Sequence, residues 1–340
     1  MLTYIFKRIL LFVPTLLVIT VITFAIGQMA PGDPVDRILG PQSAGGDMVA
    51  DQELNREIRE ALRDSLGLND PVITQYASWV GGIFTLDFGK SYIDRKPVID
   101  KIGERIWVTL GMSVLSILLA YLIAIPIGIY SATHPGSFLD RMMSTSLFAL
   151  YSIPTFWAGT LVLIYLTNND YLISLFPTRG LYSTANDGSW SLLQNWIDIA
   201  WHLVAPVMIY TYTSFAFISR QMRAGMIEVV RQDYIRTARA KGLSERVVIY
   251  KHALRNSLIP IITLLAGLLP ALVGGSLIVE MIFSIPGMGL LSFNALLARD
   301  YPVIMGVLTL SAVLTMFGVL FADLLYSMVD PRIAFAKKNA

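Results

Sequence analysis

The stretch IWVTLGMSVLSILLAYLIAIPIGIYSAT, residues 106–133, contains 28 consecutive residues without Asp, Glu, Lys or Arg. An α-helix rises about 1.5 Å per residue, so about 20 apolar residues cross the roughly 30 Å hydrocarbon core of a bilayer. The run is therefore long enough to span a membrane as one helix. Pro126 inside it is tolerable there, because neighbouring helices and hydroxyl side chains satisfy the carbonyl groups that a proline frees.

The composition of the whole chain agrees with this stretch. Of the 340 residues, 55% are hydrophobic and 15% are charged, and the mean hydropathy is +0.61. Soluble globular proteins carry about 25% charged residues, so the composition argues against a soluble enzyme, and its hydrophobicity argues against disorder. The absence of Cys excludes disulfides and thiolate metal sites, and the net charge of +2 gives no field that favours nucleic acid. We expect a polytopic membrane protein.

Six charge-free runs are long enough to span the bilayer: residues 9–29, 106–133, 142–169, 199–219, 256–279 and 301–322. A shorter run at 71–86 is typical of an interfacial helix. The run 281–298 is divided by Ser284-Ile285-Pro286-Gly287-Met288-Gly289, which favours a re-entrant or surface-lying pair of half-helices. The sequence predicts an all-α integral membrane protein with six transmembrane helices.

Charge sets the orientation of these spans. With the N-terminus inside, the inner segments carry 15 Lys and Arg against 5 acids, and the outer segments carry 11 against 18. Basic residues near span ends stay on the cytoplasmic side, so both termini, including Lys337 and Lys338, are predicted to be cytoplasmic. We divide the chain into a first transmembrane helix (1–29), an extracytoplasmic segment with short helices (30–105) and a core membrane domain (106–340) with the other five transmembrane helices.

One cytoplasmic segment, residues 220–255, holds nine of the 26 Lys and Arg residues. Apolar residues recur through it at helical spacing, and Gly242 interrupts them where a first helix can end. Ser244 can then cap a second helix. The pattern predicts a helix–Gly–helix elbow. Two interpretations remain open: the elbow docks in a groove of another protein, or it binds anionic lipid.

The elbow also carries a family resemblance. The run DYIRTARAKGLS (233–244), followed by KHALRN (251–256) and Pro260, resembles the EAA loop of ABC-importer permeases, in the form found in the dipeptide/oligopeptide/nickel family. Arg236 and Thr237 replace the Glu and Ala of the general pattern, as in the peptide branch. Further matches to the first, B-type permease of such a pair extend over nearly the whole chain: Pro31-Gly32-Asp33-Pro34, Gln75-Tyr76, Trp79, Ile285-Pro286-Gly287-Met288-Gly289 and Asp330-Pro331-Arg332.

The resemblance implies the ABC type I importer permease fold and a coupling loop that docks on a separate ATPase. Small residues are expected to let the loop fit an ATPase groove, and basic residues to orient it. The implied docking residues are Asp233, Tyr234, Arg236, Ala238, Arg239, Ala240, Lys241 and Gly242. The implied partners are a second homologous permease, two cytoplasmic ABC ATPases, an extracytoplasmic substrate-binding protein and membrane lipid, with no nucleic acid.

The chain offers no energy source of its own. A P-loop signature is missing, and the ionisable residues within the spans, His202 and Asp323, lie near span ends, where a proton relay is not expected. ATP and Mg²⁺ are therefore expected to bind the partner ATPases, with no cofactor, metal or catalytic residue in this chain. Candidates for the translocation path or gate are Gly267, Gly274, Gly275 and Glu280, since glycines permit close helix approach.

The resemblance leaves the substrate open. Di- or oligopeptides, nickel chelates and glutathione-like solutes are all transported by systems with these motifs. A lipid-binding scaffold or channel subunit is the alternative of another class. The expected location is the plasma or inner membrane of a bacterium or archaeon.

Overall fold

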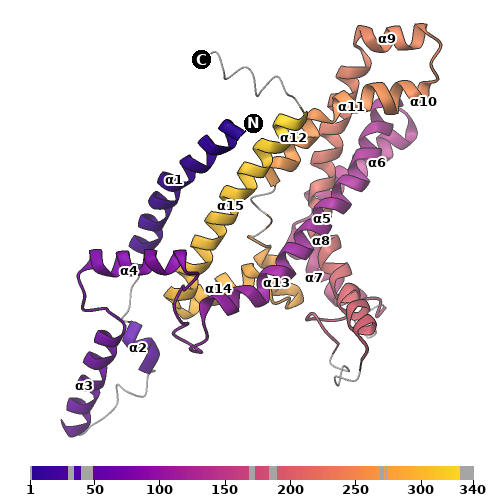
Figure 1. Ribbon diagram of the computed structural model, residues 1–340. Helices are drawn as coiled ribbons and strands as arrows, with labels where there is room; N and C mark the ends of the chain where they lie inside the picture. Colours follow the sequence, from indigo (N-terminus) through magenta and orange to yellow (C-terminus); the bar gives the residue numbers. More distant parts are fainter. Residues whose placement is uncertain are drawn as a thin grey trace. The chain divides into compact units, whose positions relative to one another are not determined.

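The computed structural model describes residues 2–29, 34–39, 49–167, 173–183, 190–268, 272 and 274–329 (Figure 1). Within them every regular element is a helix, apart from two isolated β-bridges. Two compact units are present: one contains residues 2–106 and 291–314, the other residues 107–290 and the chain from Thr315 onward. The predicted positions of Pro31 to Asp33, Asp330 to Arg332, Lys337 and Lys338 lie outside the described residues.

Long apolar helices dominate the described part of the chain. Four of them are long and apolar enough to cross a membrane: α1 (Leu2–Met29), α5 (Val98–Thr133), α8 (Leu192–Val230) and α15 (Tyr301–Val329). Two bent pairs raise the number to six if each pair is one span: α6 (Phe138–Ser152) with α7 (Thr155–Leu166), and α13 (Leu277–Phe283) with α14 (Met288–Ala298). The predicted all-α membrane fold is confirmed.

The predicted span 142–169 is bent rather than straight. Helices α6 and α7 meet at 93°, with Ile153 in an extended conformation between them. Pro154 follows Ile153 and disfavours the helical conformation of the residue before it. The bend is fixed from α8, because the Tyr212 hydroxyl donates a 2.7 Å hydrogen bond to the Ile153 carbonyl.

The predicted span 256–279 is not a single helix. It consists of α11 (Leu254–Ser257), α12 (Ile259–Leu268) and the first turn of α13, with Gly274, Gly275 and Ser276 outside helix. Ten residues of α12 rise only about 15 Å, which is half of the hydrocarbon core. The interruption has a physical cause in Gly275, whose φ of +65° is incompatible with a right-handed helix.

The predicted break in residues 281–298 is present. Helices α13 and α14 meet at 90°, and Ser284 between them has a left-handed φ of +53°. In the unit that contains residues 107–290, helix α8 contributes to two apolar clusters at different positions along its length. Ala205, Val207 and Tyr212 pack with Phe283 of α13, whereas Met222 and Met226 pack near the C-terminal end of α8. Helix α8 therefore extends from its contact with α13 to the elbow that follows Val230.

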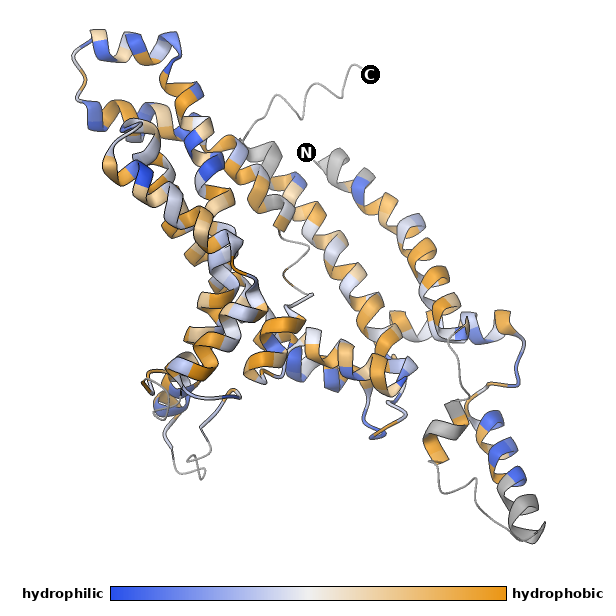
Figure 2. Cartoon of the chain, turned by 180° about the vertical axis from the view of Figure 1, so that it is seen from behind, coloured by the Kyte–Doolittle hydropathy of each residue, from blue (hydrophilic) through white to orange (hydrophobic). Residues whose placement is uncertain are grey.

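In the other unit, α4 (Val72–Phe84) packs against α1, and α2 (Pro34–Leu39) and α3 (Val49–Ser65) precede it. The Tyr76 hydroxyl lies 2.9 Å from Thr20 Oγ1, and the Phe24 ring contacts both Tyr76 and Trp79. Figure 2 shows that α1 consists mostly of hydrophobic residues, whereas α3 carries strongly hydrophilic residues. The predicted short helix at 71–86 is thus α4, held to α1 by residues of the Gln75-Tyr76 and Trp79 motif.

Candidate functional site

The elbow predicted in residues 220–255 is present at the end of α8. Helix α9 (Asp233–Ala240) is followed by Gly242 with φ +76°, and α10 (Glu245–Val247) begins after Ser244. The Gly242 N–H donates to the Arg239 carbonyl (2.9 Å), and the Leu243 N–H donates to the Ala238 carbonyl (3.4 Å). These two bonds form a Schellman motif, which requires the left-handed residue that glycine supplies without strain.

The second half of the elbow differs in detail from the prediction. Ser244 has the extended backbone of an N-cap, but its side chain makes no capping hydrogen bond. Helix α10 continues into a π-helix, η2 (Val248–Ala253), before α11 begins. Figure 1 shows α9 and α10 running alongside each other as a short hairpin.

One face of the elbow is buried against the chain itself. Ile235 and Val248 are 0% exposed and Ala238 is 7% exposed, and all three pack with Met222 and Met226 of α8. Ala238 therefore holds α9 to its own unit, and it is buried, unlike the other predicted docking residues. The burial of Ile235 three residues before Ala238 agrees with the predicted helical spacing.

The remaining residues of α9 and α10 are exposed, and Figure 2 shows strongly hydrophilic residues in both helices. Arg239 donates to Glu245 through Nε (2.7 Å) and Nη2 (3.4 Å), and Arg236 lies 3.7 Å from Asp233. The Tyr234 hydroxyl accepts a 2.7 Å hydrogen bond from Asn256. The other predicted docking residues with exposed positions are Ala240, Lys241 and Gly242. Seven of the eight predicted docking residues thus share the exposed part of the elbow.

Close contacts join the elbow to the rest of its unit. A Cβ on Gly128 of α5 would lie 2.6 Å from Met222 Cβ and 2.7 Å from the Ser219 carbonyl oxygen, so α5 and α8 approach closely there. Arg223 of α8 forms a 3.2 Å ion pair with Asp140, which is 4% exposed. A displacement of the elbow and the end of α8 would therefore move α5 and α6 as well, because these helices are in close contact with α8.

The path candidates lie in different environments. Gly267 and Gly274 are exposed, and no atom of the described chain lies within 4 Å of a Cβ built on Gly267. Gly275 lies beside a buried carboxylate, that of Glu280, whose exposed fraction is 0%. Glu280 is therefore enclosed by its own unit and does not line an open passage in this structure. Of the four candidates for the path or gate, Gly275 and Glu280 lie next to each other.

Glu280 occupies a cradle built by three glycines and a threonine. The Leu290 N–H donates to Oε2 (2.7 Å) and Thr109 Oγ1 donates to Oε1 (3.2 Å), while the Met288 N–H donates to Thr109 Oγ1 (2.8 Å). A Cβ on Gly275 or Gly287 would collide with the carboxylate, and one on Gly289 would lie 3.1 Å from Oε2. The glycines of the Ile285–Gly289 motif thus leave the space that the carboxylate fills.

A second buried polar cluster lies in the unit that contains α1. Ser91 is fully buried and its hydroxyl donates to Asp300, while Lys101 Nζ donates to Ser91 Oγ (3.1 Å) and to Asp94 (2.9 Å). Burial acts to raise the pKa of Asp94, but hydrogen bonds and the Lys101 charge outweigh it and hold that pKa below its ordinary value. Because Ser91 is inaccessible, its hydrogen bond to Asp300 is a structural link between the 90–101 segment and the residue that precedes α15.

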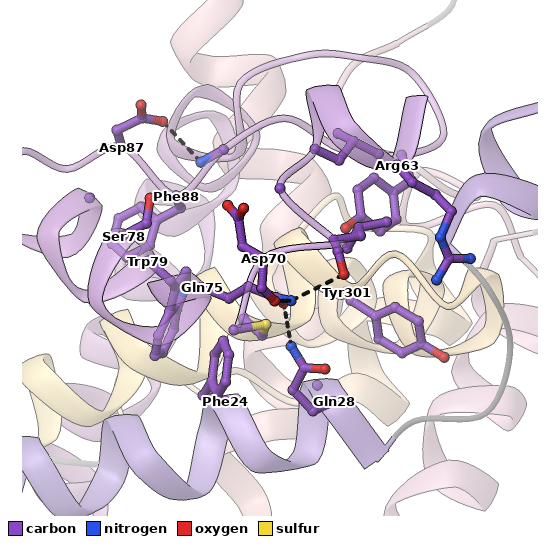
Figure 3. A pocket seen from close by; sticks show the side chains of 18 residues that line it. Phe24, Gln28, Arg63, Asp70, Gln75, Ser78, Trp79, Asp87, Phe88 and Tyr301 are labelled. Carbon is purple, nitrogen blue, oxygen red and sulfur yellow. Dashed lines mark hydrogen bonds between the residues drawn. The ribbon is translucent and has the colours of Figure 1, made fainter. Parts of the chain in front are cut away.

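The same unit contains a cavity of about 630 Å³, shown in Figure 3. The Phe24 and Trp79 rings lie 5.9 Å apart on one side. Beside them Gln28 donates to Gln75 (2.8 Å), and Gln75 donates to the Asp70 carbonyl (2.8 Å). The volume of this cavity is within the range that is typical of small-molecule binding sites.

Sequence reasoning missed the partners of these buried groups. Thr109 is 171 residues from Glu280, and Ser91 is 209 residues from Asp300, so no local pattern joins them. His202 was expected to form hydrogen bonds near a span end, and its Nδ1 lies 2.8 Å from the Asp198 carbonyl. Among the described residues, no group of three or more His, Asp or Glu side chains suits a metal ion.

These features define a class: a multi-pass helical membrane protein with an exposed, charged elbow on a rigid support. The chain belongs to the family described as the inner membrane component of binding-protein-dependent transport systems, whose profile matches residues 124–335. The N-terminal profile of membrane components of such systems matches residues 1–113. The Ser91–Lys101–Asp300 cluster joins residues from both matched regions.

Curated relatives align over nearly the full length. The chain is 39% identical to the oligopeptide transport system permease protein AppB of Bacillus subtilis (strain 168) over 336 residues, which is 98% of this chain and 100% of the relative. It is 34% identical to the dipeptide transport system permease protein DppB of Escherichia coli (strain K12) over 352 residues, with coverages of 99% and 100%.

A solved structure shares the fold. The inward-facing MetNI methionine ABC transporter, in its CY5 native crystal form, aligns with a TM-score of 0.51 and 19% identity. The alignment covers 67% of this chain and 96% of that one. Together with the long apolar helices, this likeness confirms the predicted fold, that of ABC type I importer permeases.

Proposed function

We propose that this chain is the permease subunit of an ATP-driven ABC importer and forms half of the translocation path for di- or oligopeptides. The relatives named above are permeases of oligopeptide and dipeptide transport systems, and they align end to end with this chain. A nickel chelate or a glutathione-like solute would use the same kind of complex, but neither of the two relatives named above carries such a name. The peptide assignment is therefore preferred.

The elbow is the proposed docking surface for the ATPase. Its exposed residues are Asp233, Tyr234, Arg236, Arg239, Ala240, Lys241 and Gly242. The observation that carries the proposal is that the opposite side of the elbow is buried against α8. ATP and Mg²⁺ would bind in two partner ATPases, whose closure would displace α9 and α10. Packing of Ile235 against Met222 and Met226 would pass that displacement to α8 and allow alternating access.

The remaining partners follow from the same proposal. A second homologous permease would supply the other half of the path, and an extracytoplasmic binding protein would deliver the peptide. The lipid-binding alternative belongs to a different class of protein, whereas the relatives that align end to end with this chain are named as permeases of transport systems.

The test is reconstitution of the complete transporter in proteoliposomes with its binding protein. We expect ATP-dependent uptake of a radiolabelled dipeptide, and co-purification of this chain with an ATPase that contains a P-loop. Isolation of the chain as a homo-oligomer without an ATPase would contradict the proposal. Uptake of a nickel chelate with no uptake of peptides would retain the transporter and exclude the peptide assignment.

A further inference from the structure

A second cavity, of about 190 Å³, lies within the unit that contains residues 107–290. Two helices of that unit, α5 and α8, supply most of its lining, and Leu268 and Leu272 complete it. The residues from the two helices are Ser113, Ser116 and Ile117 of α5, and Tyr210, Thr213 and Ser214 of α8. Five of these six side chains carry a hydroxyl group, and none is charged.

The two helices contribute by the same pattern. Ser113, Ser116 and Ile117 have the spacing i, i+3, i+4, which places three side chains on one face of a helix. Tyr210, Thr213 and Ser214 repeat this spacing on α8. Both sets lie near the middle of helices of 36 and 39 residues that are candidate spans. A band of hydroxyls thus faces a cavity at the depth where hydrocarbon surrounds the protein.

Two of these hydroxyls are buried without a hydrogen-bond partner. Ser113 and Ser116 are 2% and 3% exposed, and neither Oγ has a partner in the described part of the chain. Hydroxyls in spanning helices commonly donate to the carbonyl four residues earlier, as Thr160 does to Phe156 (2.8 Å). An unpaired buried hydroxyl is costly, so a group that enters the cavity gains two ready partners.

We propose that this hydroxyl band is a subsite that binds the amide groups of a peptide as it crosses the membrane. The inference rests on the proposed function and deepens it. A hydroxyl both donates and accepts hydrogen bonds, as a peptide unit does with its N–H and C=O. Because none of the described lining residues is charged, the subsite recognises the peptide backbone and not the charged termini or a particular side chain.

The size of the cavity fits one part of a larger site. About 190 Å³ is below the 300–1,000 Å³ that is typical of small-molecule pockets, so the cavity is too small to enclose a whole oligopeptide. In the proposed complex the second permease would supply the opposite wall. Backbone recognition of this kind suits a transporter that accepts peptides of differing sequence.

The test compares Ser113→Ala/Ser116→Ala with the wild type in the reconstituted complete transporter. The measured quantity is the uptake rate of a dipeptide and of its N-methylated analogue, each at saturating loaded binding protein. Removing two hydrogen-bond partners should slow dipeptide uptake roughly tenfold, which corresponds to about 1.4 kcal/mol. The analogue lacks the amide N–H, so the substitution should slow its uptake less than it slows dipeptide uptake. The uptake rates of the two substrates should therefore be closer to each other in the variant than in the wild type.

Two controls separate binding from structure. Thr160→Val removes a hydroxyl that already has a partner on its own helix, and it should leave uptake unchanged. Ser113→Thr/Ser116→Thr keeps both hydroxyls and should restore most of the uptake. The alanine pair should not lower the melting temperature of the complex, because the two hydroxyls have no partner to lose.

Three outcomes would overturn the inference: unchanged dipeptide uptake by the alanine pair, equal slowing of both substrates, or a loss of stability that accounts for the loss of uptake. Equal slowing of dipeptide and analogue uptake would indicate that the hydroxyls bind water and not the peptide amide. In each case peptide uptake by the wild type keeps the proposed function intact. Absence of peptide uptake by the wild-type complex would instead overturn the proposed function itself.

Discussion

Glu280 and Arg239 are charged residues of the same compact unit, but their surroundings are opposite. The Glu280 carboxylate is fully enclosed by Thr109, the Leu290 N–H and glycines. The Arg239 side chain is 40% exposed and paired with Glu245 across the tip of the elbow. The hydrogen-bond partners of Glu280 all belong to this chain, whereas the elbow around Arg239 exposes charged side chains and main chain to a binding partner. The cradle therefore holds the chain together, and the elbow is available to a partner.

The largest expected effect tests the cradle. Gly287→Ala places a methyl group against the Glu280 carboxylate and should destabilise the chain by about 3 kcal/mol, a large cost of overpacking. Glu280→Ala should cost about as much, since it leaves the Leu290 N–H and Thr109 without their acceptor. Thermal unfolding in detergent measures both.

The double variant sharpens this test. Glu280→Ala removes the group with which the new methyl collides. The loss of stability in Gly287→Ala/Glu280→Ala should therefore be smaller, by about 1 kcal/mol or more, than the sum of the losses in the two single variants. Strict additivity would mean that Gly287 does not act by leaving room for the carboxylate.

The next effect tests the support of the elbow. Ile235→Ala removes a side chain that is 0% exposed and should destabilise α9 locally by about 2–3 kcal/mol. The neighbouring Arg236→Ala should have almost no effect on stability, because the Arg236 side chain is 75% exposed. Hydrogen exchange of the α9 amides measures the difference. Equal protection in the two variants would contradict the assignment of an inner and an outer face.

A smaller change tests the outer face against its partner. Gly242→Asn adds a side chain where the described chain leaves open space, and Asn tolerates the left-handed backbone. Stability should change by less than about 0.5 kcal/mol, but binding of the ATPase should weaken about tenfold. Gly136→Asn is a matched control, since Gly136 also has a positive φ and open surroundings. Equal weakening by both variants would exclude a specific contact at Gly242.

The smallest effect concerns the Arg239–Glu245 pair. Both side chains are partly exposed, so Arg239→Ala should cost less than about 1 kcal/mol, and the difference should shrink as salt is raised. Thermal unfolding at low and high ionic strength measures it. A cost of several kcal/mol that persists in high salt would indicate that the pair is part of the support and not of the exposed face.

The same contrast explains what the sequence could predict. The elbow was predictable because its signals are local: Gly242 separates two helices, and apolar residues recur three and four positions apart. The cradle was not, because Thr109 and Glu280 meet only through the tertiary fold. The Ile285–Gly289 motif was visible, but its glycines have a purpose only once the carboxylate of Glu280 is placed among them.

The spans show the same limit. Charge-free length located the membrane helices, but it could not show that 142–169 bends or that 256–279 is interrupted. Pro154 and Gly275 were visible as helix breakers, yet prolines are also tolerated within spans, as Pro126 is within α5. Whether a proline bends a helix depends on contacts such as that of Tyr212 with Ile153, which the sequence does not show.

The most direct measurement of the central claim is cross-linking at the elbow. The chain contains no Cys, so a single Cys can be introduced without background. Lys241→Cys in the complete transporter, treated with a short bis-maleimide, should give an adduct with the mass of this chain plus one ATPase subunit that carries a native or introduced Cys in its docking groove. Lys90→Cys, in the predicted extracytoplasmic segment, should give none. An ATPase adduct from Lys90→Cys, or none from Lys241→Cys, would contradict the account.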